Sequence, residues 1–250
     1  MTLQEFFRRH PRAALAFSGG TDSAYLLWAA VRYAERVGAY YVRTPFQPAF
    51  ALEDARRMAG ELGAELRVVE LDVLAEGDIA ANRPDRCYHC KRAMLTAAAA
   101  AAREDGLALL LDGTNASDDA AGRPGFRALE ELGALSPLRL CGLTKAEIRR
   151  LSREAGLFTW DKPAYSCLAT RIPPGEAITA EKLQTVEAAE GALSAMGFRD
   201  FRVRLDGGLA KLQLPASQMP LLLERRREAV RALKTHCRGA VLDLEARDEQ

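Results

Sequence analysis

RAALAFSGGTDS (residues 12–23) is an apolar run that passes into two glycines and a cluster of small polar side chains. The apolar part predicts a short buried strand, and Gly19 and Gly20 after it predict a tight turn. Residues 21–38 carry apolar side chains at helical spacing, with Gly38 as the expected C-terminal cap. A glycine-rich turn between a strand and the positive N-terminus of a helix is typical of a phosphate-binding site.

The polar side chains of this turn indicate which kinds of ligand it can bind. Ser18, Thr21 and Ser23 supply hydroxyl donors, and Asp22 is suited to position a magnesium ion or to orient the loop. The chain contains neither the G-x-x-x-x-G-K-[ST] pattern of Walker loops nor the G-x-G-x-x-G pattern of dinucleotide folds. A plain strand-to-helix turn, in which Asp and Ser act as ordinary caps, is the alternative interpretation.

Outward from this turn, apolar strands alternate with helices up to residue 157, a pattern that indicates a parallel sheet covered on both faces. After an irregular stretch at 158–179, the pattern changes to that of a small α+β unit. We therefore predict a Rossmann-like α/β domain in residues 1–165, followed by a small α+β domain in residues 166–250. The expected strands are 12–17, 39–44, 65–71, 107–115 and 240–246, the expected helices 21–38, 51–63, 91–106, 143–157, 180–196 and 217–236, and a hairpin is expected to turn at 206–208.

The composition of the 250 residues is that of an ordinary globular protein, with 48% apolar and 28% charged residues. No apolar stretch is long enough for a membrane span, and the N-terminus lacks the apolar region of a signal peptide. We therefore expect a cytoplasmic protein with no membrane partner. The net charge of +1 provides no general attraction to nucleic acid, so nucleic acid is not an expected partner.

Two of the five cysteines, Cys87 and Cys90, form a C-x-x-C pair in "DRCYHCKRAM" (85–94). Such a pair can be a redox couple, half of a metal site or two unligated thiols. A third cysteine, Cys167, lies in the irregular segment "KPAYSCLATRIPPGE", four residues before Arg171. A lone cysteine is usually a small packing residue, and we interpret the two remaining ones, at positions 141 and 237, in that way.

The chain resembles a known superfamily in its glycine-rich turn and a known family along nearly its whole length. The turn resembles the SGGxDS loop of the PP-loop ATP pyrophosphatase superfamily. Segments along nearly the whole chain, in order, resemble the LarE family: "TPFQPAFALEDARRMA", "DRCYHCKRAM", "LLDGTNASDDAAGRPGFRAL", "LSPLRLCGLTKAEIR", "WDKPAYSCLATRIPPGE" and "FRVRLDGGLAKL". The resemblance implies an ATP-dependent sulfur transferase that adenylates a carboxylate of a pyridinium dicarboxylate mononucleotide and converts it to a thiocarboxylate of the nickel-pincer nucleotide cofactor. It also implies a sulfide donor and a homo-oligomer.

This resemblance implies roles for individual residues. Ser18, Gly19, Gly20, Asp22 and Ser23 would hold the pyrophosphate of ATP and its Mg²⁺, and Gly113 and Thr114, after the strand at 107–115, would border the same phosphates. Arg202 and Arg204 alternate along one strand and would bind the phosphate of the substrate. One departure is that the family's usual "DD…DYRPG" reads "DDAAGRPG" here, with Ala121 and Gly122 at the changed positions.

Within the family, the cysteines distinguish two chemistries. In one, the cysteine that matches Cys167 surrenders its own sulfur. In the other, three cysteines hold a [4Fe–4S] cluster that relays sulfide, and here Cys87, Cys90 and Cys167 match those three. The open alternatives are a zinc site completed by His89 or Cys141, a disulfide, the sacrificial chemistry, tRNA 2-thiolation by a relative in the superfamily, and a catalytically silent nucleotide-binding module.

Overall fold

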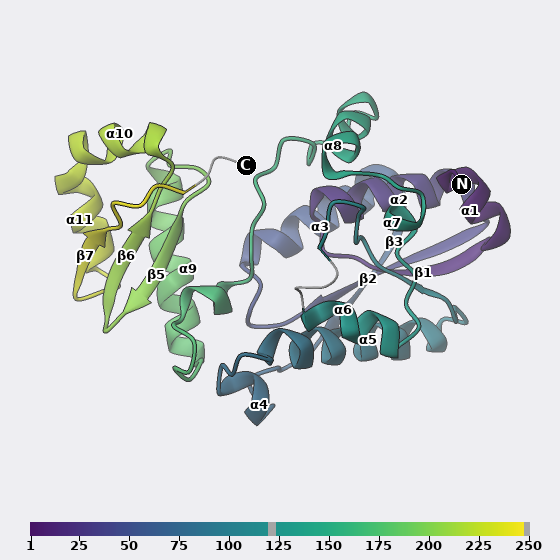
Figure 1. Cartoon of the computed structure of the whole chain (residues 1–250), viewed down its shortest axis with the longest axis horizontal. Helices are drawn as coiled ribbons and strands as arrows, with labels where there is room; N and C mark the ends of the chain where they lie inside the picture. The colour runs from purple at the N-terminus through teal and green to yellow at the C-terminus, as the bar shows by residue number, and fades with distance from the viewer. Residues whose placement is uncertain (120–123, 248–250) are drawn as a thin grey trace. The chain divides into compact units, whose positions relative to one another are not determined.

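The computed structural model describes residues 1–119 and 124–247. The changed positions Ala121 and Gly122 lie outside the described residues. The chain forms two compact units, which are described one at a time (Figure 1). The first unit comprises Met1–Val73 and Asp85–Lys162, and the second comprises Leu74–Pro84 and Pro163–Gln250. The second unit therefore includes a short segment from the first half of the chain, which the sequence did not predict.

The first unit contains the predicted parallel sheet, with strand order β3-β2-β1-β4. All three pairings are parallel, so the carboxyl ends of the strands lie at one edge. Its strands are β1 (Arg12–Ala16), β2 (Arg36–Arg43), β3 (Glu65–Glu70) and β4 (Leu110–Leu111). Its helices are α1 (Leu3–Arg9), α2 (Thr21–Tyr33), α3 (Ala49–Leu62), α5 (Arg86–Glu104), α6 (Pro124–Glu131), α7 (Pro137–Leu140) and α8 (Lys145–Glu154).

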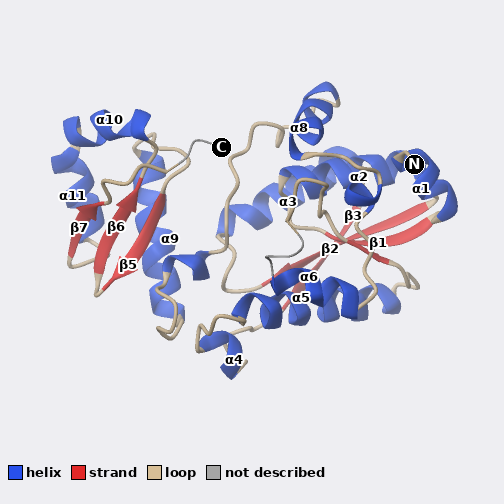
Figure 2. Cartoon of the chain, in the orientation of Figure 1, coloured by secondary structure: helices blue, strands red, loops and turns tan. Residues whose placement is uncertain are grey.

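Helices cover both faces of this sheet, as predicted (Figure 2). Alternate residues of β1 belong to different hydrophobic clusters, because successive side chains of a strand point to opposite faces. Leu15 packs with α1, α2 and α3 on one face, whereas Ala14 packs with α5 and α6 on the other. In β2, Tyr41 and Tyr40 divide between the two faces in the same way. The two strands β1 and β2 are therefore buried on both sides of the sheet.

The expected cap at Gly38 was wrong. The helix ends at Tyr33, and Gly38 lies inside strand β2, opposite Ala14. A Cβ atom at Gly38 would lie 3.0 Å from the ring of Tyr40 and 3.1 Å from Leu107. The glycine is therefore explained by lack of space in the sheet and not by a helix end. Thr144 and Glu147 have the T-x-x-E spacing that predicts a capping box, and both reciprocal hydrogen bonds are present at the start of α8.

The second unit contains a three-stranded sheet of order β5-β6-β7. Its strands are β5 (Arg202–Asp206), β6 (Leu209–Gln213) and β7 (Gly239–Leu242), and the antiparallel β5–β6 pair confirms the predicted hairpin. Its helices are α4 (Gly77–Ala80), α9 (Ala180–Ala195), α10 (Met219–Glu224) and α11 (Arg226–Lys234), with 3₁₀ turns at Leu168–Arg171 and Ala216–Gln218. The helix expected at 217–236 is thus divided near Arg225. No helix in the described residues is long and apolar enough to span a membrane.

Candidate functional site

The turn after β1 leaves the N-terminus of α2 without a side-chain cap. Gly19 has a φ of +71°, and a Cβ atom there would lie 3.1–3.2 Å from Ala55 of α3, so both its conformation and its surroundings require glycine. Gly20 is the N-cap of α2 and provides no side-chain hydrogen bond to the helix. The first-turn N–H groups of α2 are therefore not occupied by a capping side chain and can bind an anion.

Hydroxyl groups hold the shape of this loop. Ser18 and Ser23 share a hydrogen bond of 3.0 Å between their Oγ atoms, and Ser23 also donates to the carbonyl oxygen of Gly20. The hydroxyl of Thr21 points elsewhere, because it donates to the buried carbonyl oxygen of Thr159 at 2.7 Å. Ser18 and Ser23 thus fix the shape of the loop, whereas Thr21 anchors the helix.

Asp22 is the acidic group of the loop, and its two oxygens differ. Its Oδ2 accepts a hydrogen bond from Nζ of Lys145, 2.7 Å away, at the first residue of α8. Its Oδ1 is buried and has no hydrogen-bond partner among the described residues. An ionised carboxylate with an unsatisfied buried oxygen is a ready ligand for a cation. The sequence did not single out Lys145, because nothing in a helix start indicates that its side chain reaches a loop 123 residues earlier.

The carboxyl end of β4 lies directly against this loop. A Cβ atom on Gly113 would lie 3.1 Å from the backbone nitrogen of Ser23, so a side chain there would displace the loop. The buried Asp112 accepts hydrogen bonds from Thr114 and Ser136, and from Nζ of Lys91 at 3.1 Å. Of the two predicted residues, Gly113 thus abuts the glycine loop and Thr114 is bonded to Asp112, at the edge of a parallel sheet where ligands commonly bind.

Lys91 connects that edge to the helix of the C-x-x-C pair. Cys87 and Cys90 lie in the first turns of α5, and residues three apart share one helix face. Cys87 is exposed and accepts a hydrogen bond from Nη2 of Arg86, whereas Cys90 is half-buried, 3.9 Å from the sulfur of Met94.

None of the five cysteines, all of which the structure describes, forms a disulfide. His89 is hydrogen-bonded to Asp85, so its ring is directed along the helix. Cys141 and Cys237 pack against the hydrophobic clusters of the two units, and burial raises the pKa of both thiols. Within residues 1–119 and 124–247, no three His, Cys, Asp or Glu side chains come together as a metal site.

Cys167 lies in the second unit, in a segment whose backbone is hydrogen-bonded to the side chain of Arg171. The fully buried guanidinium donates through Nη1 to the carbonyl oxygens of Ser166 and Cys167 and to the hydroxyls of Ser166 and Thr170. Through Nε and Nη2 it pairs with Glu190 of α9 at 2.8 and 3.2 Å. The backbone that carries Cys167 is therefore fixed to the core of the second unit by one side chain.

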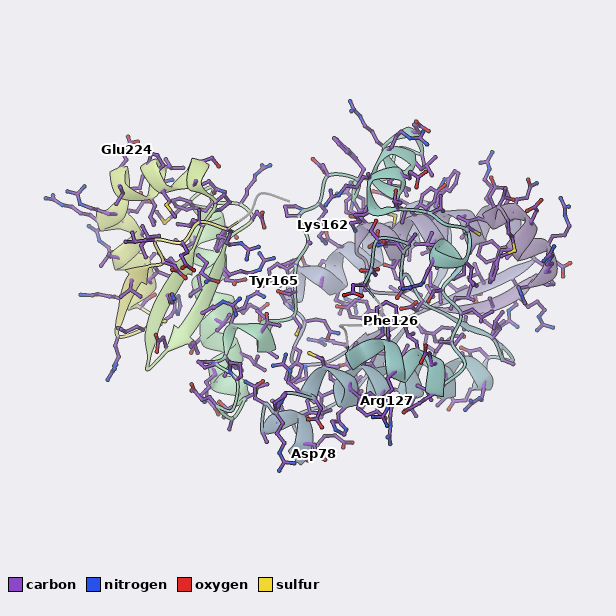
Figure 3. All side chains as sticks on the ribbon, in the orientation of Figure 1. Asp78, Phe126, Arg127, Lys162, Tyr165 and Glu224 are labelled. Carbon is purple, nitrogen blue, oxygen red and sulfur yellow. The ribbon has the colours of Figure 1, made fainter. Side chains whose placement is uncertain are left out.

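Glu190 satisfies several buried donors at once. Besides Arg171, its carboxylate accepts hydrogen bonds from the hydroxyl of Tyr165 and from the backbone N–H of Val203. The ring of Tyr165, labelled in Figure 3, contacts the guanidinium groups of Arg171 and Arg202. Burial, together with the Glu190 charge, raises the pKa of Tyr165 well above its ordinary value, so the hydroxyl remains a donor. The sequence indicated no role for Glu190 in this cluster.

The two arginines of β5 contact the same segment. Arg202 is buried and donates to the carbonyl oxygens of Phe201 and Ala164, and burial lowers its pKa to about 10. Arg204 is half-buried and donates to the carbonyl oxygen of Thr170 and to Gln213. The two side chains therefore hold both ends of the Cys167 segment, which the alternating pattern in the sequence did not reveal.

Comparisons with known proteins agree with this architecture. No family model matches the chain. An uncharacterized protein of Synechocystis sp. is 38% identical over 87% of this chain and 81% of its own length. The pyridinium-3,5-bisthiocarboxylic acid mononucleotide synthase of Lactiplantibacillus plantarum is 33% identical over 83% of this chain and 76% of its own length.

Among solved structures, NMN synthetase from Francisella tularensis has a similar fold, with a TM-score of 0.53. The similarity covers 65% of this chain and 70% of that one, at 18% identity. The fold, the glycine loop at the carboxyl edge of its sheet and the identity to the Lactiplantibacillus protein lead to one conclusion. The chain belongs to the LarE family and has the PP-loop ATP pyrophosphatase fold.

Proposed function

We propose that this protein is an ATP-dependent sulfur transferase that acts on pyridinium-3,5-dicarboxylate mononucleotide in the synthesis of a nickel-pincer nucleotide. The observation that carries the ATP-dependent step is the uncapped start of α2 behind Gly19 and Gly20, with the unsatisfied Oδ1 of Asp22 beside it. The name and 33% identity of the Lactiplantibacillus protein support the choice of substrate.

The first step is adenylation of a substrate carboxylate. A carboxylate oxygen attacks the α-phosphorus of ATP, the bond to the bridging oxygen breaks, and pyrophosphate leaves with the negative charge. The N–H groups of α2 and the hydroxyls of Ser18 and Ser23 are the donors that would stabilise that charge. Gly113 and Thr114 would border the same phosphates, since Gly113 abuts Ser23.

A magnesium ion fits this loop. Mg²⁺ in nucleotide sites is commonly held by one or two carboxylates together with the phosphates of the substrate. Asp22 provides one such carboxylate, and its unsatisfied buried Oδ1 matches the need of a cation ligand. When bound, the ion would neutralise charge on the leaving pyrophosphate, and Lys145 stands beside Asp22 as a second positive charge.

The second step replaces AMP by sulfur at the activated acyl carbon. A sulfur nucleophile attacks the carbonyl carbon, the bond to the phosphate oxygen breaks, and AMP leaves. Cys167 is the proposed catalytic cysteine, because Arg171 fixes its backbone and two further arginines hold its segment.

We propose Cys87, Cys90 and Cys167 as the ligands of a [4Fe–4S] cluster. The donor chemistry fits, because all three are thiols and the first two share one face at the start of α5. Three ligands leave one iron of the cluster open, and a cluster held in this way would supply sulfide for transfer. The alternative is that Cys167 gives its own sulfur and becomes dehydroalanine.

For the phosphate of the substrate, Arg204 is a better candidate than Arg202. The guanidinium of Arg202 is buried and bonded to two carbonyl oxygens, whereas Arg204 is half-buried and bonded to one carbonyl oxygen and to Gln213. A buried arginine would have to break hydrogen bonds before it could meet a ligand, which costs free energy. We therefore propose that Arg204 contacts the phosphate and that Arg202 supports it.

The test uses the full chain purified without oxygen, with ATP, Mg²⁺ and a sulfide source. We expect pyrophosphate and AMP to form with the dicarboxylate mononucleotide, together with a thiocarboxylate detected by mass spectrometry. Transfer RNA in the same assay is expected to give no pyrophosphate. The proposal would be overturned if tRNA supported pyrophosphate release and the mononucleotide did not, or if neither did.

Asp22→Asn tests the loop separately. The amide keeps the shape but removes the charge that faces Lys145 and that would bind the magnesium ion. Charge-assisted hydrogen bonds contribute about 1.5–3 kcal/mol, so kcat/KM for pyrophosphate release should fall about tenfold to a hundredfold. The Mg²⁺ concentration for half-maximal rate should rise. Glu53→Gln, an exposed change on α3, is the matched control and should leave both values unchanged. Unchanged Mg²⁺ dependence in Asp22→Asn would remove Asp22 from the metal site.

A further inference from the structure

Asn82 has an unusual backbone conformation in a buried place. It belongs to the segment Leu74–Pro84, which the fold assigns to the second unit. Its φ is +54°, a left-handed conformation that side chains other than glycine adopt rarely and asparagine tolerates best. The residue as a whole is only 3% exposed. A strained backbone conformation of this kind persists only where the surrounding residues stabilise it. It therefore indicates a structural or functional constraint at this position.

The surroundings of Asn82 are the residues that follow Cys167 and Arg171. Its side-chain NH₂ donates to the carbonyl oxygens of Pro173, at 2.8 Å, and Ile172, at 3.3 Å. Its own carbonyl oxygen accepts from the N–H of Gly175 at 3.0 Å. The carbonyl oxygen of Ala80 accepts from Ile178 at 2.8 Å. Residues 80–82 and 172–178 are therefore bonded to each other within the second unit.

The chemistry of the two segments explains why an asparagine stands here. Pro173 and Pro174 have no N–H, so the backbone around them offers acceptors and few donors. The amide of Asn82 provides two N–H donors, and these face two adjacent carbonyl oxygens. Aspartate is nearly the same size but would direct oxygens at those carbonyls. The contact thus depends on the amide itself.

This contact lies close in sequence to the cysteines. Asn82 lies five positions before Cys87, and Ile172 lies five positions after Cys167. Five residues span at most about 18 Å when fully extended. Pro84 restricts the conformations of the connection to Cys87, because proline fixes its own φ and limits the backbone conformation of the residue before it.

We propose that Asn82 is a positioning residue that ties the chain leading into the C-x-x-C pair to the chain leaving Cys167. A short tether raises the effective concentration of groups at its two ends, and a loosened tether lowers it. The tie limits the length of free chain that separates the C-x-x-C pair from Cys167. This inference rests on the proposed function for the use of the cysteines, but the tie itself can be tested without turnover.

The test measures how fast a short bis-maleimide joins Cys167 to Cys87 or Cys90 in the full chain, by peptide mass spectrometry. Each thiol adds across one maleimide double bond, so the reaction needs no oxidant. Asn82→Asp removes both donors while keeping the size of the side chain. Asn82→Gly accepts the positive φ but also loses the amide, and it serves if the aspartate variant does not fold. Arg83→Ala, an exposed neighbour paired with Asp78 on the surface, is the matched control.

We expect both Asn82 variants to lower the cross-linking rate at least about fivefold and to lower the iron bound per chain after anaerobic reconstitution. ATP binding should be unchanged, and single-maleimide labelling of Cys167 should not slow. Arg83→Ala should behave as the wild type. Wild-type cross-linking in a folded Asn82 variant, or no cross-link in the wild type itself, overturns the proposal. Failure of the proposed function would instead appear as absent pyrophosphate release with cross-linking intact.

Discussion

Replacement of Cys167 by serine is expected to abolish thiocarboxylate formation while pyrophosphate release from ATP continues. The groups assigned to pyrophosphate release, from Ser18 to Ser23 and at Gly113, all belong to the first unit, whereas Cys167 belongs to the second. A hydroxyl neither donates sulfur nor binds iron as a thiolate does, so the sulfur step should fall by more than about 10³-fold. Product formation and pyrophosphate release, measured in the same sample, separate the two steps. Simultaneous loss of both would place Cys167 in adenylation.

Serine at Cys87 or Cys90 distinguishes the two sulfur chemistries. If the three cysteines hold a cluster, Cys87→Ser should lose both iron and multiple turnover. If Cys167 is sacrificed, Cys87→Ser should still convert one substrate per chain, and Cys167 should lose the mass of hydrogen sulfide. Cys237→Ala, a packing cysteine of the second unit, is the control and should retain iron and turnover. Full turnover by Cys87→Ser with no iron would exclude the cluster.

Part of this architecture could be predicted from local sequence. The strand, turn and helix around Gly19, the capping box at Thr144 and the hairpin at Gly207 depend on residues close in sequence, so their patterns indicated them correctly. The prediction of a helix cap at Gly38 was wrong because a glycine that ends a helix and a glycine crowded inside a strand cannot be distinguished in a single sequence. The contact with Leu107 that decides between them is long-range.

The site was predictable only in its loop. Lys145 reaches Asp22, and Lys91 reaches Asp112, across long stretches of chain, and neither lysine stands in a pattern that reveals its partner. The alternation of Arg202 and Arg204 correctly predicted a shared strand but not that both donate to backbone carbonyls near Cys167. Asn82 carries no sequence signal at all, since its role depends on a fold that returns the chain to it ninety residues later.

Replacement of Glu190 by glutamine is expected to lower the free energy of unfolding of the second unit by about 3–5 kcal/mol, because removing one partner of a buried ion pair leaves the other charge uncompensated. Glutamine keeps the size of the side chain and an acceptor for the N–H of Val203. It loses the negative charge that pairs with Arg171, which contacts the ring of Tyr165 at 4.7 Å, with Arg202 at 5.3 Å from the same ring. Hydrogen exchange of α9 and β5 peptides in a urea series measures this loss within the second unit.

The local charge determines whether substitution of Glu190 or of Arg171 lowers the free energy of unfolding more. Burial, and after it the charge of Arg171, lowers the pKa of Arg202, so these two neighbouring cations repel each other. Arg171→Met removes one of these cations and should therefore destabilise less than Glu190→Gln. The double variant removes both members of the pair and should cost less than the sum of the two single changes.

Two comparisons make this prediction specific. Gln184→Ala, on an exposed position of the same helix α9, should change the free energy of unfolding by no more than about 0.5 kcal/mol. Equal costs for the two single changes and full additivity in the double variant would show that the pair is not coupled. If the pair is coupled, labelling of Cys167 by a maleimide should accelerate in Arg171→Met even under conditions where the chain stays folded. That acceleration follows because Arg171 bonds the Cys167 carbonyl directly, so the same side chain that stabilises the second unit also orders the segment that carries the reactive sulfur.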